Sequence, residues 1–476
     1  MESYHQIILM SYGDDLNIIK TQNATEDSVN IIKSKFHSII NNKYEEADEG
    51  YAFFREENSS YISKIVIYKE KKIIHTIVKE NGYFDNYPIV YINNDIFNMD
   101  YKNITLYEIE KMIAGEEINP ESVSEFIVAR PNNNYNESRI RILKRLINIL
   151  ILSKEDHRKV ILKDSGRNCL MWIGALSFLF PVRLAQDISF NSLSNGIDNN
   201  FDINCIKEKN DITISLYVEN ESEYYIHDLI EGLESKPALD TRYANLAQIG
   251  YTISYDNIKN VINFMDKFQY VNINHDIEDC YSLYSFIYTM SSMESDRIIK
   301  GIEFLDRYGD KHIKYGIINI LELRITSNIS VISNEVALSF IDLMHDVAEC
   351  YNDDKFYKKS FRFLGMYINE LIIMRKYMAT EDIVDFFEKV YYKNRDKRDL
   401  IIKYLLGKAN ANYLKKYIKD DGRVSTVYSM IIDIIGNDGE DAEWYVKALI
   451  ENRLSGHKYE GTRHRYKAQV MSVHRN

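Results

Sequence analysis

The feature that most constrains this chain is a helical hydrophobic periodicity that runs almost unbroken from Tyr255 to Leu454, with no proline after Pro237. Apolar residues that recur every three or four positions mark one face of a helix, and proline is the residue that most often ends one. We therefore expect an all-α domain over residues 255–455, with helices at 255–269, 277–307, 312–326, 334–352, 355–375, 380–394, 397–418, 423–435 and 440–454. Successive helices of similar length without a fixed period predict an irregular, α-solenoid-like array.

The first 131 residues mix strand and helix patterns. A helix is expected over Ser28–Asn41, with Ser28 as its N-cap, because apolar residues from Val29 to Ile40 fall on one face. Short runs rich in β-branched residues predict strands at Gln6–Met10, Tyr61–Tyr68 and Lys72–Val78. This order predicts an α+β domain over residues 1–131, and the polar stretch Asn132–Asn136 after Pro131 is expected to be a linker.

Residues 138–250 are expected to form a second, α/β domain. Its predicted helices are Ser138–Leu152, Arg167–Phe180 (ended by Pro181) and Glu223–Leu233, and its predicted strands are Arg158–Lys163, Asp187–Leu193 and Asp211–Val218. The fold class that follows is α+β, with a mixed α/β N-terminal half and an all-α helical array as the C-terminal half.

The turn Asp164–Asn168 lies between a predicted strand and helix, where an α/β unit would place a phosphate-binding loop. A P-loop needs several glycines and a Lys-Ser/Thr pair, whereas this turn has a single glycine and no such pair. The favoured interpretation is a tight turn with a helix cap, and Asp164 and Arg167 are retained as residues of functional interest.

His75 is the other residue of functional interest, because it interrupts an apolar strand and an imidazole buried there needs a hydrogen-bond partner. A satisfied core histidine is favoured over a catalytic one. The acidic run Glu45–Glu49 matches no calcium-loop pattern and is interpreted as a solvated loop before a buried strand. The pairing of acid with imidazole in Glu155–His157 and Asp310–His312 is interpreted as solvated surface. No residue is predicted to be catalytic, to bind a cofactor or to bind a metal.

The formal net charge of -12 argues against broad, non-specific binding of nucleic acid, which needs a basic face. The four cysteines form no CxxC pair, and no secretion signal or membrane span is indicated, so we expect a cytoplasmic protein with reduced thiols. Residues 456–476 form a basic tail. A solvated terminus is favoured there over contact with nucleic acid or an acidic partner through Lys458, Arg463, Arg465 and Lys467.

Several segments in residues 1–235 resemble the bacterial GTPase-associated proteins of conflict-type gene clusters. The N-terminal segments are the opening strand at His5-Gln6 with Tyr12-Gly13 after it, the strand that carries His75, and Asn86–Pro88 ahead of Phe97. The middle segments are VILKD (Val160–Asp164) and LMWIGALSFLFPVRLAQDISFNSL (Leu170–Leu193), which departs from the family pattern at Phe180-Pro181, where Leu-Pro is typical. The resemblance implies a non-enzymatic partner of a GTPase or related NTPase in a defence system, and it carries over no functional residues.

Three functions remain open at this point. The first is an adaptor or regulatory scaffold whose N-terminal and middle domains bind an NTPase and whose helical array binds further proteins. The second is an effector enzyme, a nuclease or hydrolase, whose active site assembles only in the fold. The third is a nucleic-acid-sensing helical-repeat protein that uses its basic tail. The adaptor is favoured, because the sequence contains no recognised catalytic motif.

Overall fold

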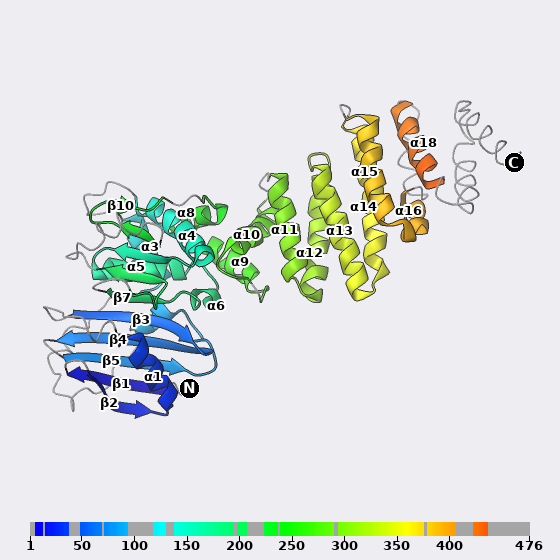
Figure 1. Ribbon diagram of the computed structural model, residues 1–476. Helices are drawn as coiled ribbons and strands as arrows, with labels where there is room; N and C mark the ends of the chain where they lie inside the picture. The colour runs from blue at the N-terminus through cyan, green and yellow to red at the C-terminus, as the bar shows by residue number, and fades with distance from the viewer. Residues whose placement is uncertain are drawn as a thin grey trace, which may run out of the picture. The chain divides into compact units, whose positions relative to one another are not determined.

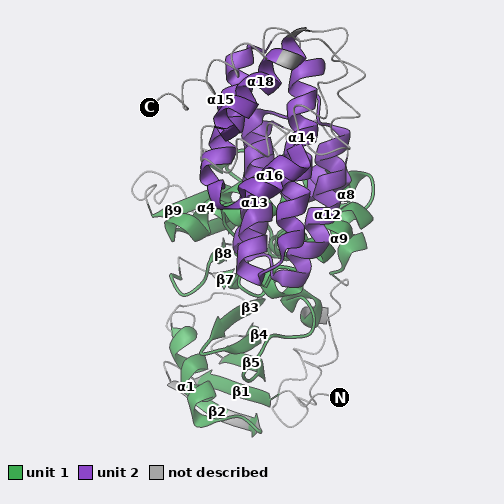
Figure 2. Cartoon of the chain, turned by 90° about the vertical axis from the view of Figure 1, so that its right-hand side faces the viewer, with its two compact units in different colours: residues 1–281 green, residues 282–476 purple. Residues whose placement is uncertain are grey.

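The computed structural model divides the chain into two compact units, residues 1–281 and residues 282–476 (Figures 1 and 2). None of the helices described is long and apolar enough to cross a bilayer. The structure describes residues 5–12, 15–37, 48–68, 71–93, 118–129, 138–194, 198–206, 223–236, 239–269, 271–289, 294–375, 378–405 and 422–436. The predicted strand at 211–218, the predicted helix at 440–454 and the basic tail at 456–476 lie outside these ranges.

The first unit is built on a ten-stranded mixed sheet, to which both of the first two predicted domains contribute strands (Figure 1). The order across the sheet is β10-β9-β6-β8-β7-β3-β4-β5-β1-β2. Strands β9, β6, β8 and β7 are parallel neighbours, and all other neighbours are antiparallel. The strands are β1 (His5–Tyr12), β2 (Asp15–Gln22), β3 (Asp48–Glu56), β4 (Ser59–Tyr68), β5 (Lys71–Lys79), β6 (Lys159–Lys163), β7 (Phe190–Ser194), β8 (Ile203–Ile206), β9 (Tyr224–Asp228) and β10 (Leu233–Glu234).

One face of the antiparallel part is covered by α1 (Glu26–Lys35), whose Ile32 and Phe36 are fully buried in a core shared with β1, β3, β4 and β5. The predicted N-cap, Ser28, is wrong by three residues: Thr25 is the cap, and its side chain accepts a hydrogen bond from the Ser28 backbone N–H. Serine and threonine are both common N-cap residues, so the sequence alone did not show which of Thr25 and Ser28 caps the helix.

The parallel part is covered on one face by α4 (Arg139–Asp156) and α5 (Gly166–Ser177), which contact β6 to β9. The helix predicted over Glu223–Leu233 is wrong, because residues 224–228 form β9 between β6 and β10. All five residues of β9 are buried. A short, continuously buried strand shows no alternation, and its pattern cannot be distinguished from that of a buried helix.

The remaining helices of the first unit are short, apart from α10, within which the division between the units falls. They are α3 (Pro120–Val128), α6 (Val182–Ala185), α8 (Arg242–Thr252), α9 (Asp256–Met265) and α10 (His275–Tyr288), with the 3-10 helix η1 (Pro88–Asn93). Pro181 is the N-cap of α6, so the proline that ends the predicted helix also starts the next one.

The second unit is a run of helices, as predicted, and no strand is described in it. Helices of the array lie side by side (Figure 1), with α11 against α13, α13 against α14, and α14 against α16. They are α11 (Ser295–Tyr308), α12 (Lys311–Ser327), α13 (Asn334–Tyr351), α14 (Asp354–Ile373), α15 (Thr380–Lys393), the 3-10 helix η5 (Arg395–Lys397), α16 (Arg398–Leu405) and α18 (Gly422–Gly436).

The single helix predicted over 277–307 is wrong, since α10 ends at Tyr288 and α11 begins at Ser295. The intervening sequence contains neither proline nor glycine, so the pattern gave no stop signal. The two helices approach closely at Gly301, where a Cβ would lie 3.0 Å from the backbone nitrogen of Leu283. A larger residue there would push α11 away from α10.

Arginine side chains of the array donate hydrogen bonds to backbone carbonyls near helix ends and in the connections between helices. Arg324 of α12 donates to the carbonyl of Phe286 at 3.0 Å. Arg375, after α14, donates to the carbonyls of Ile329, Ser330 and Ile332 in the connection between α12 and α13. Arg423 of α18 donates to the carbonyl of Ile372 at the end of α14 and to those of Arg375 and Met378 after it. Because the last carbonyls of a helix have no partner within it, these contacts satisfy groups that each helix leaves open.

Candidate functional site

The turn after β6 brings Asp164 to the N-terminus of α5, as the sequence predicts. One carboxylate oxygen of Asp164 accepts hydrogen bonds from the backbone N–H of Ser165 (2.7 Å) and the side-chain amide of Asn168 (2.9 Å), and the other accepts from the indole of Trp172 (3.0 Å). Arg167 is exposed on the first turn of α5. Since three donors of the protein itself occupy the Asp164 carboxylate, it anchors the turn and the helix, in keeping with the favoured interpretation of this segment.

An ion pair next to this turn was not anticipated from the sequence. Lys163, the last residue of β6, lies 3.2 Å from Asp228 at the end of β9, and both side chains are fully buried. The parallel register that pairs Lys163 with Asp228 explains their meeting. A carboxylate oxygen of Asp228 also accepts hydrogen bonds from the backbone N–H groups of Ile230 and Glu231. The pair therefore joins two strand ends to the turn that leads into β10.

His75 lies on the face of the antiparallel part opposite α1, in a row of polar side chains that crosses four strands. Its Nε2 lies 3.3 Å from the Oε1 of Gln6 on β1, and its register partner on β4 is Lys64. Lys64 Nζ in turn lies 3.9 Å from Glu49 on β3. His75 is only 1% exposed and has a partner, so its geometry matches the predicted core histidine.

Burial shifts the two charged members of this row toward neutrality. It raises the pKa of Glu49 and lowers the pKa of Lys64, and the attraction between the two groups partly offsets both shifts. Opposite shifts of this kind are common at active sites, but they also occur in structural ion pairs. Lys64 is 3% exposed. Because Lys64 is buried and the Glu49 side chain is only 34% exposed, the row holds neighbouring strands together.

The outward faces of α12 and α14 differ from this core, because they expose large apolar side chains. Leu323 is 74% exposed and Ile320 36% exposed on α12, and Met366 is 38% exposed on α14. Lys358 and Arg362 are exposed two turns and one turn before Met366 on the same face of α14. These five residues are called the α12–α14 patch.

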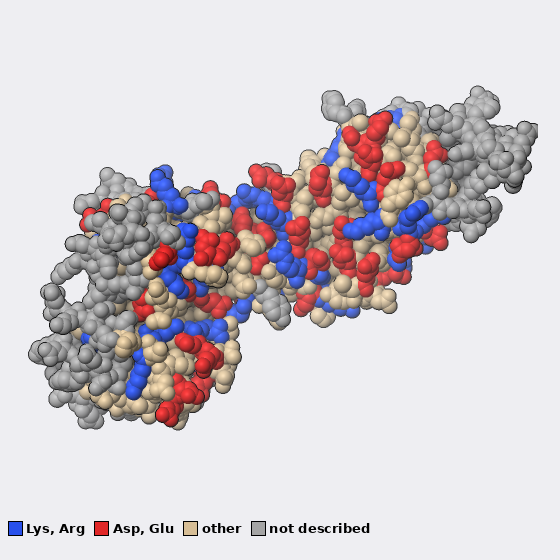
Figure 3. Space-filling model, in the orientation of Figure 1, with Lys and Arg blue, Asp and Glu red and all other residues tan. Residues whose placement is uncertain are grey.

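The helices that carry the patch are fixed to one another by side-chain contacts. Lys359 of α14 donates to the carboxylate of Glu322 at 2.6 Å and to the amide oxygen of Asn319 at 2.7 Å, both on α12. Tyr315 of α12 donates to Asp353 at 2.8 Å, and its ring packs edge-on against Phe356. The patch is therefore a firmly held surface. Elsewhere on the side of the second unit seen in Figure 3, acidic and basic side chains are interspersed.

The candidate contact residues of the basic tail, Lys458, Arg463, Arg465 and Lys467, lie outside the described residues, and their proposed roles stay predictions. Among the predicted residues of interest, the structure places Asp164 and Arg167 in one turn and His75 in the antiparallel part of the sheet. Sequence comparison adds no assignment: no family model matches the chain, and no curated protein matches it.

Proposed function

We propose that this protein is a non-enzymatic adaptor that binds a GTPase or related NTPase of a bacterial defence system, and that it binds this NTPase through the α12–α14 patch of the helical array, in place of the N-terminal and middle domains expected from the sequence. The nature of the NTPase partner rests on the resemblance of residues 1–235 to GTPase-associated proteins. The observation that supports binding through the array is the exposure of Ile320, Leu323 and Met366 on neighbouring helices that are otherwise well packed. Exposed apolar groups with a polar rim are typical of protein-binding surfaces.

The basic residues of the patch on α14 indicate the chemistry of the partner surface. The outward stripe of α14 exposes Lys355, Lys358 and Arg362, which are all basic, directly before Met366. A complementary partner segment carries apolar residues together with aspartate or glutamate, since opposite charges across an interface speed association and favour the right partner. The proposal places the protein in the cytoplasm, where an NTPase partner of this kind acts.

The test measures binding between the full chain and the NTPase encoded beside its gene, by calorimetry with purified proteins. Leu323→Asp is expected to weaken binding by about tenfold or more, because it removes about 1.5–3 kcal/mol of apolar burial. Arg362→Glu is expected to weaken it more at low salt than at high salt, because exposed charges are screened. Val331→Asp is the matched control, since Val331 is 77% exposed in the α12–α13 connection, outside the patch.

Two results would contradict the proposal. One is unchanged affinity in Leu323→Asp, which would remove the patch from the interface. The other is hydrolysis of GTP or ATP by the purified chain alone, at a rate that survives further purification, which would make the chain an enzyme. Leu323 is largely exposed, so the variant is expected to fold normally, and circular dichroism verifies this.

A further inference from the structure

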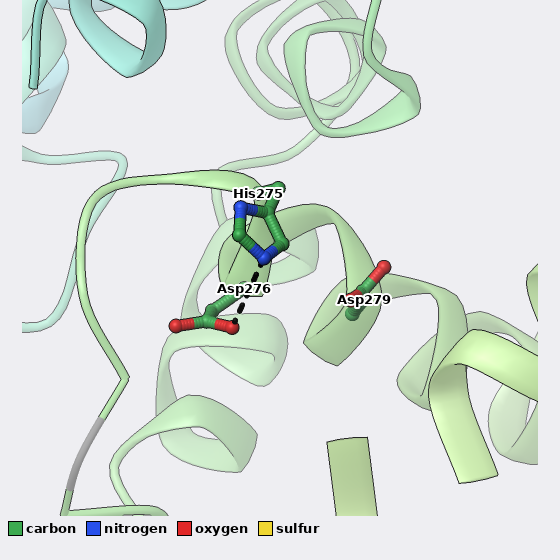
Figure 4. Close-up of side chains that lie close together, drawn as sticks. All are labelled: His275, Asp276 and Asp279. Carbon is green, nitrogen blue, oxygen red and sulfur yellow. Dashed lines mark ion pairs between the residues drawn. The ribbon is translucent and has the colours of Figure 1, made fainter. Parts of the chain in front are cut away.

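Three potential metal-binding side chains come together at the start of α10. His275 is its first residue, Asp276 follows it, and Asp279 lies one turn later on the same side of the helix as His275 (Figure 4). One ligand atom from each residue, an imidazole nitrogen and two carboxylate oxygens, lies within 4.8 Å of the other two. In Figure 4 the imidazole lies between the two carboxylates.

Burial distinguishes this cluster from an ordinary acidic surface. Asp276 is 2% exposed and Asp279 is 8% exposed, whereas the imidazole of His275 is 66% exposed. The two carboxylates are held close together and largely away from water, an arrangement that a bound cation stabilises. The exposed imidazole leaves the cluster open to an ion from solution.

A second observation, from a different helix, orients the imidazole as a ligand. Glu155, near the end of α4, accepts a hydrogen bond from the backbone N–H of His275 at 2.8 Å, and the same oxygen lies 3.3 Å from Nδ1 of the ring. Nε2 points to the other side, 3.8 Å from the Oδ1 of Asp276 (Figure 4). Metal-binding histidines commonly use one nitrogen for the metal and the other for a carboxylate, which fixes the tautomer and the ring orientation.

We propose that His275, Asp276 and Asp279 bind a divalent first-row transition metal, with Glu155 as the positioning residue. One imidazole and two carboxylates form a ligand set suited to Zn²⁺ or Mn²⁺, whereas Ca²⁺ and Mg²⁺ prefer oxygen ligands alone. Three protein ligands leave a coordination position for water or for a carboxylate of a partner protein. This site is independent of the α12–α14 patch, and neither proposal depends on the other.

The alternative is a metal-free arrangement in which a protonated His275 pairs with Glu155 and Asp276. The two differ in their response to added metal. A metal site binds Zn²⁺ through the imidazole and the two carboxylates, whereas a simple ion pair binds no metal.

The test is calorimetric titration of the full chain with Zn²⁺ after removal of metal with EDTA and exchange into EDTA-free buffer. His275→Ala is the principal variant, because a side chain this exposed is expected to be replaced without unfolding the protein. It is expected to weaken one binding event by about 100-fold or more, beyond the roughly 10- to 100-fold cost of losing an outer partner. Glu155→Gln is expected to weaken the same event by about tenfold.

His312→Ala is the matched control, because His312 is exposed in the first turn of α12 two residues after an aspartate. It is expected to leave the binding event unchanged, and the contributions of other surface histidines then appear equally in all variants. The Co²⁺-loaded chain supplies a second readout, since its visible absorption reports the ligand set and is expected to change in Asp279→Asn. Equal Zn²⁺ affinity in the wild type and His275→Ala, or no Zn²⁺ binding by the wild type, would overturn the proposal.

Discussion

At the scale of single residues, His227 is buried without a hydrogen-bond partner for either ring nitrogen. It lies on β9 and is 1% exposed. Burial, assisted by the nearby Arg145, lowers its pKa to about 3, although Asp228 opposes the shift. His345 on α13 is similar: burial lowers its pKa to about 4, and its Nε2 lies 2.6 Å from the hydroxyl of Ser360. Both rings are therefore neutral in the folded protein at neutral pH.

The sign of the resulting pH dependence follows from proton uptake. Between pH 6.5 and the lowered pKa, the unfolded chain protonates each imidazole and the folded protein does not, so stability is lost as the pH falls. We expect His227→Leu to reduce the slope of unfolding free energy against pH in that window by about 1.4 kcal/mol per pH unit. Urea unfolding at several pH values measures the slope. An equal slope in His227→Leu and in the control His312→Leu would contradict the assignment.

The same residue-scale contacts show why the candidate sites were only partly predicted from sequence. A hydrogen-bond partner for His75 was expected from the strand that carries it, and a helix cap was expected in the turn Asp164–Asn168, where Ser165 is the N-cap of α5. The meeting of Glu155 with His275 joins residues 120 positions apart, and Lys163 meets Asp228 through strand register. No local pattern encodes such pairs, so neither could be predicted from the sequence, in which Glu155–His157 was interpreted only as solvated surface.

At the scale of elements, Arg375 supports the connection between α12 and α13. It donates to the carbonyls of Ile329, Ser330 and Ile332, and its guanidinium also lies 3.2 Å from the hydroxyl of Tyr367. We expect Arg375→Met to lower the unfolding free energy of the second unit by about 2 kcal/mol, because it leaves carbonyls without donors. Arg375→Lys is expected to recover only part of this loss, since a single ammonium cannot match the planar fork of arginine.

Hydrogen exchange of residues 326–336 and urea unfolding measure the effect of the Arg375 variants. Lys358→Met, on α14, is the control, because Lys358 is exposed. If Arg375→Met and Lys358→Met were equally stable, the contacts of Arg375 would have no part in holding the connection.

Element boundaries in the array were well predicted where caps are strong. Asp310, Ser333 and Asp353 are N-caps whose side chains accept backbone hydrogen bonds, and the helices that follow them begin within a residue of their predicted starts. The errors occur where such signals are absent, between α10 and α11 and at β9. The strand β2 was also not predicted, although it contains Ile18, Ile19 and Thr21, because its longest apolar run is only two residues.

At the scale of the whole molecule, each unit contains its own buried core. Leu364 of α14 is fully buried in the second unit, and Leu146 of α4 is 1% exposed in the first. In stacked helical arrays each helix contacts mainly its neighbours, so a destabilising substitution acts first on the adjacent helices. Strands and helices of one cooperative unit likewise lose their protection against hydrogen exchange together. A cavity in one unit is therefore expected to raise hydrogen exchange mainly in the elements that pack against it.

We expect Leu364→Ala, which costs about 2–5 kcal/mol, to raise hydrogen exchange throughout α13, α14 and α16 while β3, β4 and β5 keep their protection. Leu146→Ala is the reciprocal change, and it is expected to raise exchange in α4, β6 and β9 with α13 and α14 unchanged. Hydrogen exchange with mass spectrometry on the full chain compares the two variants in one experiment. A rise of equal size in both units from either substitution would mean that the two cores unfold as one, because only a shared opening reaction exposes both sets of amides together.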